Sequence, residues 1–96
     1  MDGIKVLFMR RDEAVAKKDF EQFASTQLQN IPYASIEGYI SCDKLETTVL
    51  FVANETELKK VVFVKEDYLN HTAFLLYYIV NTVNGWKIYN IVSSFS

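Results

Sequence analysis

One segment of the chain carries almost no charge: from Thr72 to Ser96 the only charged side chain is Lys87. Within it, Val83-Asn84-Gly85-Trp86 predicts a tight hairpin, because Asn-Gly tolerates the positive φ angles of a type I′ turn between antiparallel strands. With Asn84 and Gly85 as the turn residues, both faces of the hairpin are mainly apolar. A sheet that is solvated on one side should alternate apolar and polar residues. Both faces of this sheet therefore need a cover.

The first third of the chain is predicted to be helical. Its apolar residues follow helical spacing and form one stripe, and an offset near Lys17-Lys18-Asp19 interrupts that stripe. Asp19 followed three residues later by Gln22 resembles a capping box, which starts a helix. We therefore expect one helix to about Lys17 and a second from about Asp19 to about Gln29, ending before Pro32.

From Tyr33 onward the pattern is typical of strands, because segments rich in Val, Ile, Thr, Phe and Tyr alternate with short polar connections. Helices followed by a strand meander predict an α+β fold: an N-terminal kinked helix packed on a curved four- to five-stranded antiparallel sheet. A length of 96 residues allows one domain only, spanning residues 1–96. The candidate strands are Tyr33 to Ser41, Leu45 to Ala53, Leu58 to Glu66, Thr72 to Val83 and Trp86 to Phe95.

The predicted helices cover only one face of this sheet. We expect the second cover to be another copy of the chain, so that the protein is a homodimer through the sheet face. A contact of about 800 Å² per partner would be an ordinary specific interface. The alternative is a monomer in which the ends of the sheet curl over themselves.

Charge and composition exclude several classes of partner. Ten Lys and Arg residues against twelve Asp and Glu residues give a net charge of -2, so we expect no cationic surface and no nucleic-acid partner. The uncharged segment from Leu69 to Asn84 contains polar residues and does not predict a membrane span. The N-terminus lacks the apolar region of a signal peptide, and Cys42 is the only cysteine. We therefore expect a soluble, cytoplasmic protein with no membrane partner.

Candidate ligand-binding residues follow from the predicted hairpin register. That register places Tyr77, Asn81, Trp86 and Asn90 on one face of the sheet, where paired amides orient a small ligand. The alternative is that the amides hydrogen-bond across the dimer interface.

Other reactive residue types give weaker hypotheses. His71 is the only histidine and lies near Asp67, a pairing that suits acid–base chemistry, but a solvated loop histidine is the simpler interpretation. A site with one histidine and one cysteine does not favour a metal centre. We expect no metal, no cofactor and an inert Cys42.

Two segments resemble a known superfamily. The helix break at Ala16-Lys17-Lys18-Asp19-Phe20 and the ending Tyr77-Tyr78-Ile79-Val80-Asn81-Thr82-Val83-Asn84-Gly85-Trp86-Lys87-Ile88 are similar to those of the nuclear transport factor 2-like superfamily, the cystatin-like α+β cone that includes ketosteroid isomerases and polyketide cyclases. The resemblance implies a fold and frequent sheet-mediated homodimers but no reaction, since the superfamily hosts enzymes, binding modules and adaptors. Its enzymes have an additional helix, whereas only Asn30 to Pro32 connects helix to sheet here, so we expect a shallow pocket.

The function expected from these features is that of a small homodimeric binding or interaction module holding a small apolar ligand in the cone, with no catalytic residue assigned. The alternative is a small cofactor-free isomerase or dehydratase of the ketosteroid isomerase-like group. Catalysis there needs a carboxylate beside a phenol in apolar surroundings; tyrosines are available, but Glu37, Asp43 and Glu46 are expected near strand ends or loops. A cystatin-type inhibitor would need a Gln-x-Val-x-Gly hairpin, which the sequence lacks.

Overall fold

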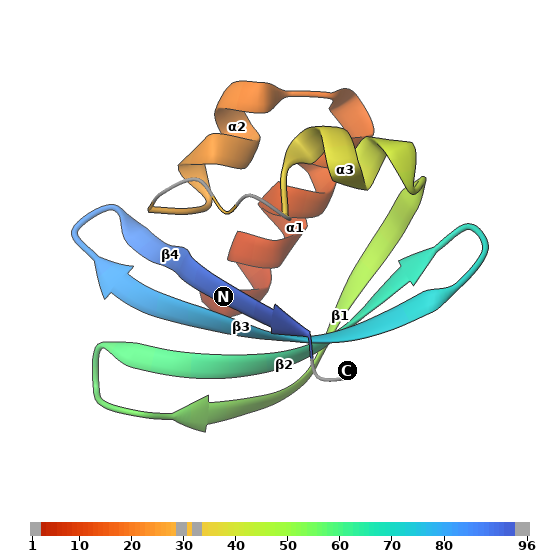
Figure 1. Ribbon diagram of the computed structural model, residues 1–96. Helices are drawn as coiled ribbons and strands as arrows, with labels where there is room; N and C mark the ends of the chain where they lie inside the picture. Colours follow the sequence, from red (N-terminus) through yellow and green to blue (C-terminus); the bar gives the residue numbers. More distant parts are fainter. Residues whose placement is uncertain (1–2, 29–30, 32–33, 94–96) are drawn as a thin grey trace.

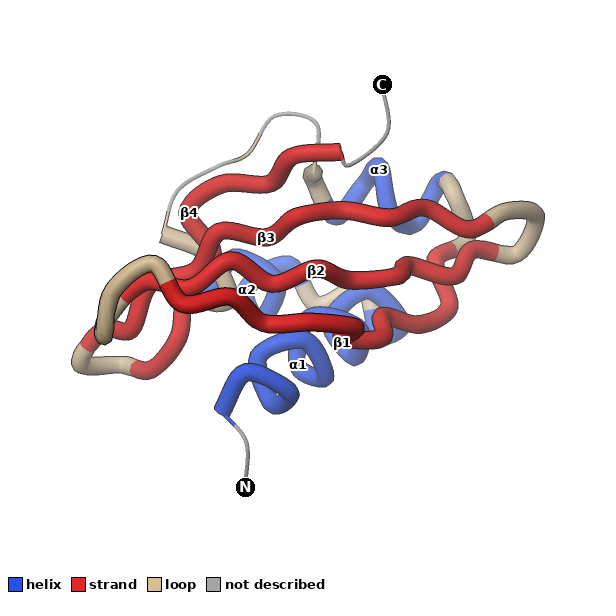
Figure 2. Tube along the Cα trace, turned by 90° about the horizontal axis from the view of Figure 1, so that it is seen from below, coloured by secondary structure: helices blue, strands red, loops and turns tan. Residues whose placement is uncertain are grey.

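The computed structural model describes residues 3–28, 31 and 34–93. Within them, helices α1 (Gly3–Lys17), α2 (Phe20–Ser25) and α3 (Ile36–Ser41) precede strands β1 (Lys44–Asn54), β2 (Lys59–Tyr68), β3 (Thr72–Thr82) and β4 (Gly85–Ser93). The strands form one antiparallel sheet in the order β1-β2-β3-β4. The sheet is curved, and all the helices lie on one face of it (Figures 1 and 2). The predicted α+β class, with a broken N-terminal helix on a curved antiparallel sheet, is confirmed.

The predicted break between the first two helices is present. Lys18 adopts a left-handed φ of 57°, and Asp19 caps α2 by accepting a hydrogen bond from the backbone N–H of Gln22 at 3.0 Å. The Gln22 side chain does not complete the capping box but donates to the carbonyl oxygen of Arg10 at 2.8 Å. This contact ties α2 to α1.

Helix α2 ends earlier than predicted, at Ser25 instead of about Gln29. The chain after it runs beside β4: the Leu28 N–H donates to the carbonyl of Ile88 at 2.9 Å, and the Ile88 N–H donates to the carbonyl of Thr26 at 2.9 Å. An edge strand offers unpaired backbone groups, and pairing with them competes here with continuing the helix.

The predicted strand from Tyr33 to Ser41 is wrong, because the part of it that contains Ile36–Ser41 forms α3; Tyr33 lies outside the described residues. Ser35 caps this helix by accepting from the Gly38 N–H at 3.2 Å. Ile36, Tyr39 and Ile40 suggested a strand, but at spacings of three and four they share one helix face and pack on the core. A third helix is therefore present where the sequence predicted a direct connection from the second helix to the sheet.

The turn between β3 and β4 also differs from the prediction. Thr82 pairs with Gly85, so the turn residues are Val83 and Asn84. Gly85 has a φ of 100°, a conformation that favours glycine because it has no Cβ. The pairing of β3 with β4 therefore differs from the predicted register, beginning with the first pair after the turn.

A bulge at Tyr89 then shifts the register of β4 again. Beyond it Tyr78 pairs with Asn90, and Tyr77 pairs with Ile91. Tyr77 and Ile91 are buried and face the helices, so Tyr78 and Asn90 lie on the opposite face.

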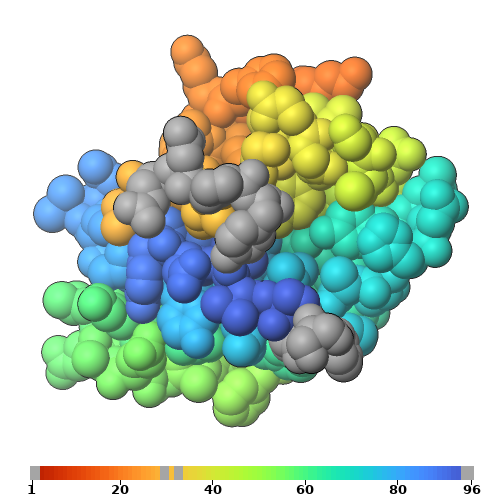
Figure 3. All heavy atoms as spheres, in the orientation of Figure 1, coloured from red at the N-terminus to blue at the C-terminus, as the bar shows by residue number. Residues whose placement is uncertain are grey.

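The core lies between the helices and the concave face of the sheet, and Figure 3 shows α2 and α3, in orange and yellow, above the blue strand β4. Among the described residues, the buried polar or charged side chains are Arg11, Thr26, Lys44 and Glu66. Buried charges need partners, and these residues define the candidate site. The apolar core residues are Ile4, Leu7, Phe8, Ala14, Val15, Phe23, Ile31, Ala34, Ile36, Tyr39, Val62, Val64, Tyr77, Ile79, Ile88 and Ile91.

The convex face of the sheet is apolar at its centre, over parts of β2 and β3. The Phe63 and Phe74 rings stack with centroids 5.9 Å apart, and Leu76 pairs with Phe63 on the same face. Phe51, paired with Phe63 from the other side, is 64% exposed. The convex face therefore has an apolar centre, but Lys59, Lys65 and Asp67 of β2 alternate with Val61 and Phe63 on it. The dimer that would cover this face stays a prediction.

Candidate functional site: a buried glutamate and three phenols

Glu66 on β2 is fully buried and accepts hydrogen bonds from the phenols of three tyrosines. Tyr68 donates to Oε1 at 2.6 Å, and Tyr39 and Tyr77 both donate to Oε2, Tyr39 at 3.3 Å. The hydroxyl oxygens of Tyr39 and Tyr77 lie 2.7 Å apart. Because the phenols come from α3, β2 and β3, this cluster joins the third helix to the sheet.

Lys44 compensates the charge of Glu66. Its ammonium nitrogen lies 3.7 Å from Glu66 Oε2 and 2.6 Å from Asp12 Oδ1, and its side chain is 1% exposed. Asp12 on α1 also accepts from the backbone N–H and the hydroxyl of Thr47, each at 2.7 Å. These contacts hold α1 on β1 beside the cluster.

Arg11 supplies a second buried cation. Its guanidinium donates to Thr26 Oγ1 and Gln27 Oε1, each at 2.9 Å. Its Cζ lies 4.0 Å from the centre of the Phe23 ring and 5.4 Å from that of Tyr39, within the range of cation–π attraction. Arg11 therefore fixes the chain after α2 against the aromatic core.

The environment keeps the phenols protonated at neutral pH. Burial, reinforced by the charge of Glu66, raises the pKa of Tyr39 to about 12. Burial also raises the pKa of Tyr77 well above its usual value, and burial together with the hydrogen bond to Glu66 raises that of Tyr68. Removing water disfavours the charged phenolate, so all three tyrosines act as hydrogen-bond donors.

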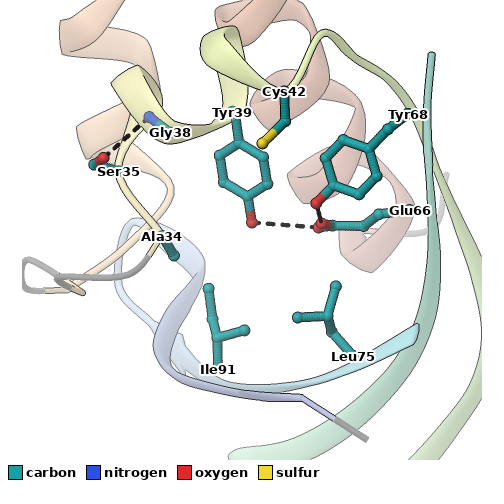
Figure 4. Close-up of a pocket in the computed structure, with 9 residues that line it drawn as sticks. All are labelled: Ala34, Ser35, Gly38, Tyr39, Cys42, Glu66, Tyr68, Leu75 and Ile91. Atoms are coloured by element: carbon teal, nitrogen blue, oxygen red, sulfur yellow. Dashed lines mark hydrogen bonds between the residues drawn. The ribbon is translucent and has the colours of Figure 1, made fainter. Parts of the chain in front are cut away.

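A pocket of about 180 Å³ ends on this cluster. In Figure 4 the Tyr39 hydroxyl and the Glu66 carboxylate point toward one another, while Leu75 and Ile91 lie on the sheet side. One wall belongs to α3, so the helix that the sequence pattern did not predict is what forms this pocket. The residues that line it are Ala34, Ser35, Gly38, Tyr39, Cys42, Glu66, Tyr68, Leu75 and Ile91.

The residues predicted to bind a ligand do not gather in one place. Tyr77 belongs to the Glu66 cluster, whereas Asn90 lies on the convex face and Asn81 is exposed on β3. Trp86 is half-buried near the β3–β4 turn. Asn81 nevertheless pairs with Trp86 on the face of β3 that carries Tyr77, so of the four residues only Asn90, which lies beyond the bulge, is moved to the other face. A ligand role for each residue stays a prediction.

The weaker sequence hypotheses fall beside the cluster. The His71 ring stacks on Tyr68 with centroids 4.5 Å apart, while Asp67 accepts from Thr72 Oγ1 at 2.9 Å and lies 3.7 Å from Lys65 Nζ. These contacts give no support to an acid–base pair of His71 and Asp67. Cys42 is a free, exposed thiol at the pocket wall.

The described residues contain no group of three His, Cys, Asp or Glu side chains placed to hold a metal ion. Among the helices in the described part of the chain, none has the length and apolar character to cross a bilayer.

Strand periodicity is the signal that would have found Glu66. Val62, Val64 and Glu66 alternate along β2, and all three are fully buried. A carboxylate in phase with two buried valines points into the core. The carboxylates considered from sequence were instead those at strand ends, so this site was missed.

Comparisons with known proteins gave no match: no protein-family profile fits the chain, and neither curated proteins nor solved structures match it. The nuclear transport factor 2-like resemblance stays an expectation drawn from the sequence.

Proposed function

We propose that the protein is a small homodimeric binding module that holds a small, mainly apolar molecule in the pocket beside Glu66. The observation that carries this proposal is a pocket of about 180 Å³ with apolar walls and a hydrogen-bonded polar end. Ligand sites in proteins combine apolar walls with a few placed polar groups. A cavity of about 150 Å³ holds benzene, so a ligand on the scale of one substituted ring fits.

The contacts of Glu66 favour binding over catalysis. A general base needs a lone pair directed at the proton that it removes. Here Tyr68 occupies Oε1, and Tyr39 and Tyr77 both donate to Oε2. Both oxygens of the carboxylate are therefore engaged with phenols, and neither is directed at the proton of a substrate.

The homodimer is supported by the area of the convex face. Four strands of about ten residues cover roughly 33 by 19 Å at standard strand spacings, or about 600 Å² before side-chain relief, close to the ~800 Å² per partner of an ordinary interface. Pairing through a two-fold axis would present the same face from both copies. The apolar side chains directed to this face include Phe51, Val61, Phe63, Leu76, Tyr78, Val80 and Val92.

The proposed location is the cytoplasm. Cys42 is the single cysteine of the sequence, and a chain with one cysteine forms no internal disulfide, which fits a reducing compartment.

The binding function is tested by titrating the ¹⁵N-labelled protein with toluene and benzyl alcohol. The expected result is saturable chemical-shift change centred on the amides of Gly38, Leu75 and Ile91. Gly38→Leu should abolish it by filling the pocket edge; an added Cβ there would meet only Ser35 Oγ, at an ordinary 3.5 Å. The matched control is Ser41→Leu on the same helix, which should bind as the wild type does. Equal binding to both variants would place the ligand elsewhere.

A second candidate is the isomerase or dehydratase of the ketosteroid isomerase-like group. It is favoured by one observation: an ionisable Glu66 lies within hydrogen-bond reach of phenols at the end of an apolar-walled pocket, although its side chain is fully buried. The test is deuterium uptake by the α-carbons of cyclopentanone in D₂O, followed by NMR. Uptake that is faster than in buffer and is lost in both Glu66→Gln and Gly38→Leu would establish catalysis.

A further inference from the structure

We propose that the pocket beside Glu66 selects small apolar molecules that carry a hydroxyl or N–H group and discriminates against carboxylates. This inference rests on the proposed binding function and names the class of ligand. It follows from where the protons and the charges of the cluster lie.

The polar end of the pocket has hydrogen-bond acceptors to offer but few protons. The proton of Tyr68 is directed to Glu66 Oε1, and that of Tyr77 to Oε2. Tyr39 lies 2.7 Å from the Tyr77 oxygen and 3.3 Å from Oε2, so its proton is also used within the cluster. An ionised carboxylate has about four lone-pair sites, and a phenol oxygen can accept as well as donate. The free capacity at this end is therefore mainly that of an acceptor.

The remaining polar groups of the lining do not change this balance. Ser35 lies apart from Glu66, at the start of α3 (Figure 4), and accepts from the Gly38 N–H at 3.2 Å. Cys42 contributes a thiol, which is a weak donor. A ligand that donates a proton consequently finds its best partner at the half-buried Tyr68 oxygen, which itself donates to the fully buried Glu66.

The charge of Glu66 disfavours binding of an anionic ligand in this pocket. Glu66 lines the pocket, whereas Lys44 and Arg11 are absent from the lining of this pocket. A carboxylate ligand would thus meet a like charge in apolar surroundings, where an unpaired charge is costly. A cationic ligand gains little, because Lys44 Nζ already lies 3.7 Å from Glu66 Oε2. A neutral donor is the class that suits both the hydrogen bonding and the charge.

The inference predicts an unusual result for the variant Tyr68→Phe. The variant keeps the ring but removes the donor to Glu66 Oε1, leaving a charged acceptor beside the pocket. A ligand hydroxyl can replace the missing phenol, and a hydrogen bond to a charged group is worth about 1.5 to 3 kcal/mol, which corresponds to at least about tenfold in affinity. Loss of a tyrosine should therefore strengthen binding of an alcohol relative to a hydrocarbon.

The experiment compares benzyl alcohol, toluene and benzoate, which share a ring and differ in one group, by NMR titration of the full chain. Benzyl alcohol should bind about fivefold or more tighter than toluene, and benzoate should give no saturable shift. In Tyr68→Phe the affinity ratio of benzyl alcohol to toluene should rise on the order of tenfold. In the matched control Tyr78→Phe, on the convex face, the ratio should stay at the wild-type value.

The outcomes separate this inference from the proposed function. Benzoate binding as tightly as benzyl alcohol, equal affinities for toluene and the alcohol, or a falling ratio in Tyr68→Phe would overturn the ligand class while leaving the binding module in place. Absence of binding by all three probes would overturn both. The amide spectra of the variants establish that each is folded before its affinities are compared.

Discussion

The hydroxyl oxygens of Tyr39 on α3 and Tyr77 on β3 lie 2.7 Å apart, and both phenols reach the same oxygen of Glu66. A polar contact, and not apolar packing alone, therefore joins the third helix to the sheet. A buried network of this kind stabilises the fold when each member is satisfied and costs much when one member is lost. The stability of the protein should be sensitive to changes of single atoms at this point.

Glu66→Gln should lower the free energy of unfolding by about 2 to 5 kcal/mol. The amide nitrogen would face phenols that donate to the carboxylate, and Lys44 would lose a charged partner at 3.7 Å. Urea denaturation followed by circular dichroism measures the change. The control is Glu46→Gln on the exposed side of β1, which should change stability by less than about 0.5 kcal/mol. Equal changes in the free energy of unfolding for the two variants would show that the hydrogen bonds and the ion pair of Glu66 do not stabilise the fold.

Alkaline pH should destabilise the protein through Tyr39. Burial raises its folded-state pKa from 10.0 to about 12, so the unfolded chain loses this proton first. The contribution is fully present below pH ~10 and is lost as the pH rises toward 12, amounting to about 3 kcal/mol. Urea denaturation at pH 9 and pH 11.5 should show about 2 kcal/mol of this fall in the wild type. Tyr39→Phe should be less stable at pH 9 but fall less between the two values; an equal fall in both would contradict the assignment.

The sequence predicted the elements whose pattern is local and repeated. The break after α1 follows from Asp19, whose short side chain reaches a backbone N–H three residues ahead. Four of the five predicted strands are present because their β-branched and aromatic residues recur over long segments. These signals depend little on distant parts of the chain.

The missed features depend on tertiary contacts. Ile36, Tyr39 and Ile40 favour a strand by residue type. In the structure, however, Ser35 caps a helix there, and the helix face that these three residues share packs on the core. The bulge at Tyr89 has no residue-type signature, and a one-residue shift moves a side chain to the opposite face. The periodicity of β2 indicates that Glu66 is buried, but its partners, the phenols from α3 and β3 and the ammonium of Lys44, are brought to it only by the tertiary fold.

Substitutions of the two neighbouring arginines on α1 should lower the free energy of unfolding by very different amounts. Arg11 is buried and donates to Thr26 Oγ1 and Gln27 Oε1, whereas Arg10 is exposed and donates to Ser25 Oγ at 3.2 Å. Both bonds of Arg11 come from Nη1, and lysine cannot reproduce the planar guanidinium that carries this nitrogen and stacks on Phe23. Arg11→Lys should therefore cost about 2 to 4 kcal/mol, and Arg10→Lys less than about 0.5 kcal/mol. Both changes are measured by urea denaturation, and similar values would show that the buried contacts of Arg11 do not stabilise the fold.

A pair of valine variants tests the convex face as the dimer interface. Val61 lies on that face, paired with Tyr78, while Val83 lies in the β3–β4 turn and is fully exposed. An unpaired lysine ammonium buried at an interface loses its hydration, so Val61→Lys should shift the species toward the 11.1 kDa monomer. Val83→Lys should leave the dimer intact.

Sedimentation equilibrium at micromolar concentration measures both variants. For the wild type and Val83→Lys we expect twice the monomer mass and a melting temperature that rises with protein concentration, because association stabilises the folded state. Val61→Lys should lose both properties. A wild-type protein that sediments at 11.1 kDa, with a melting temperature independent of concentration, would contradict the homodimer and leave the convex face exposed to water in a stable single chain.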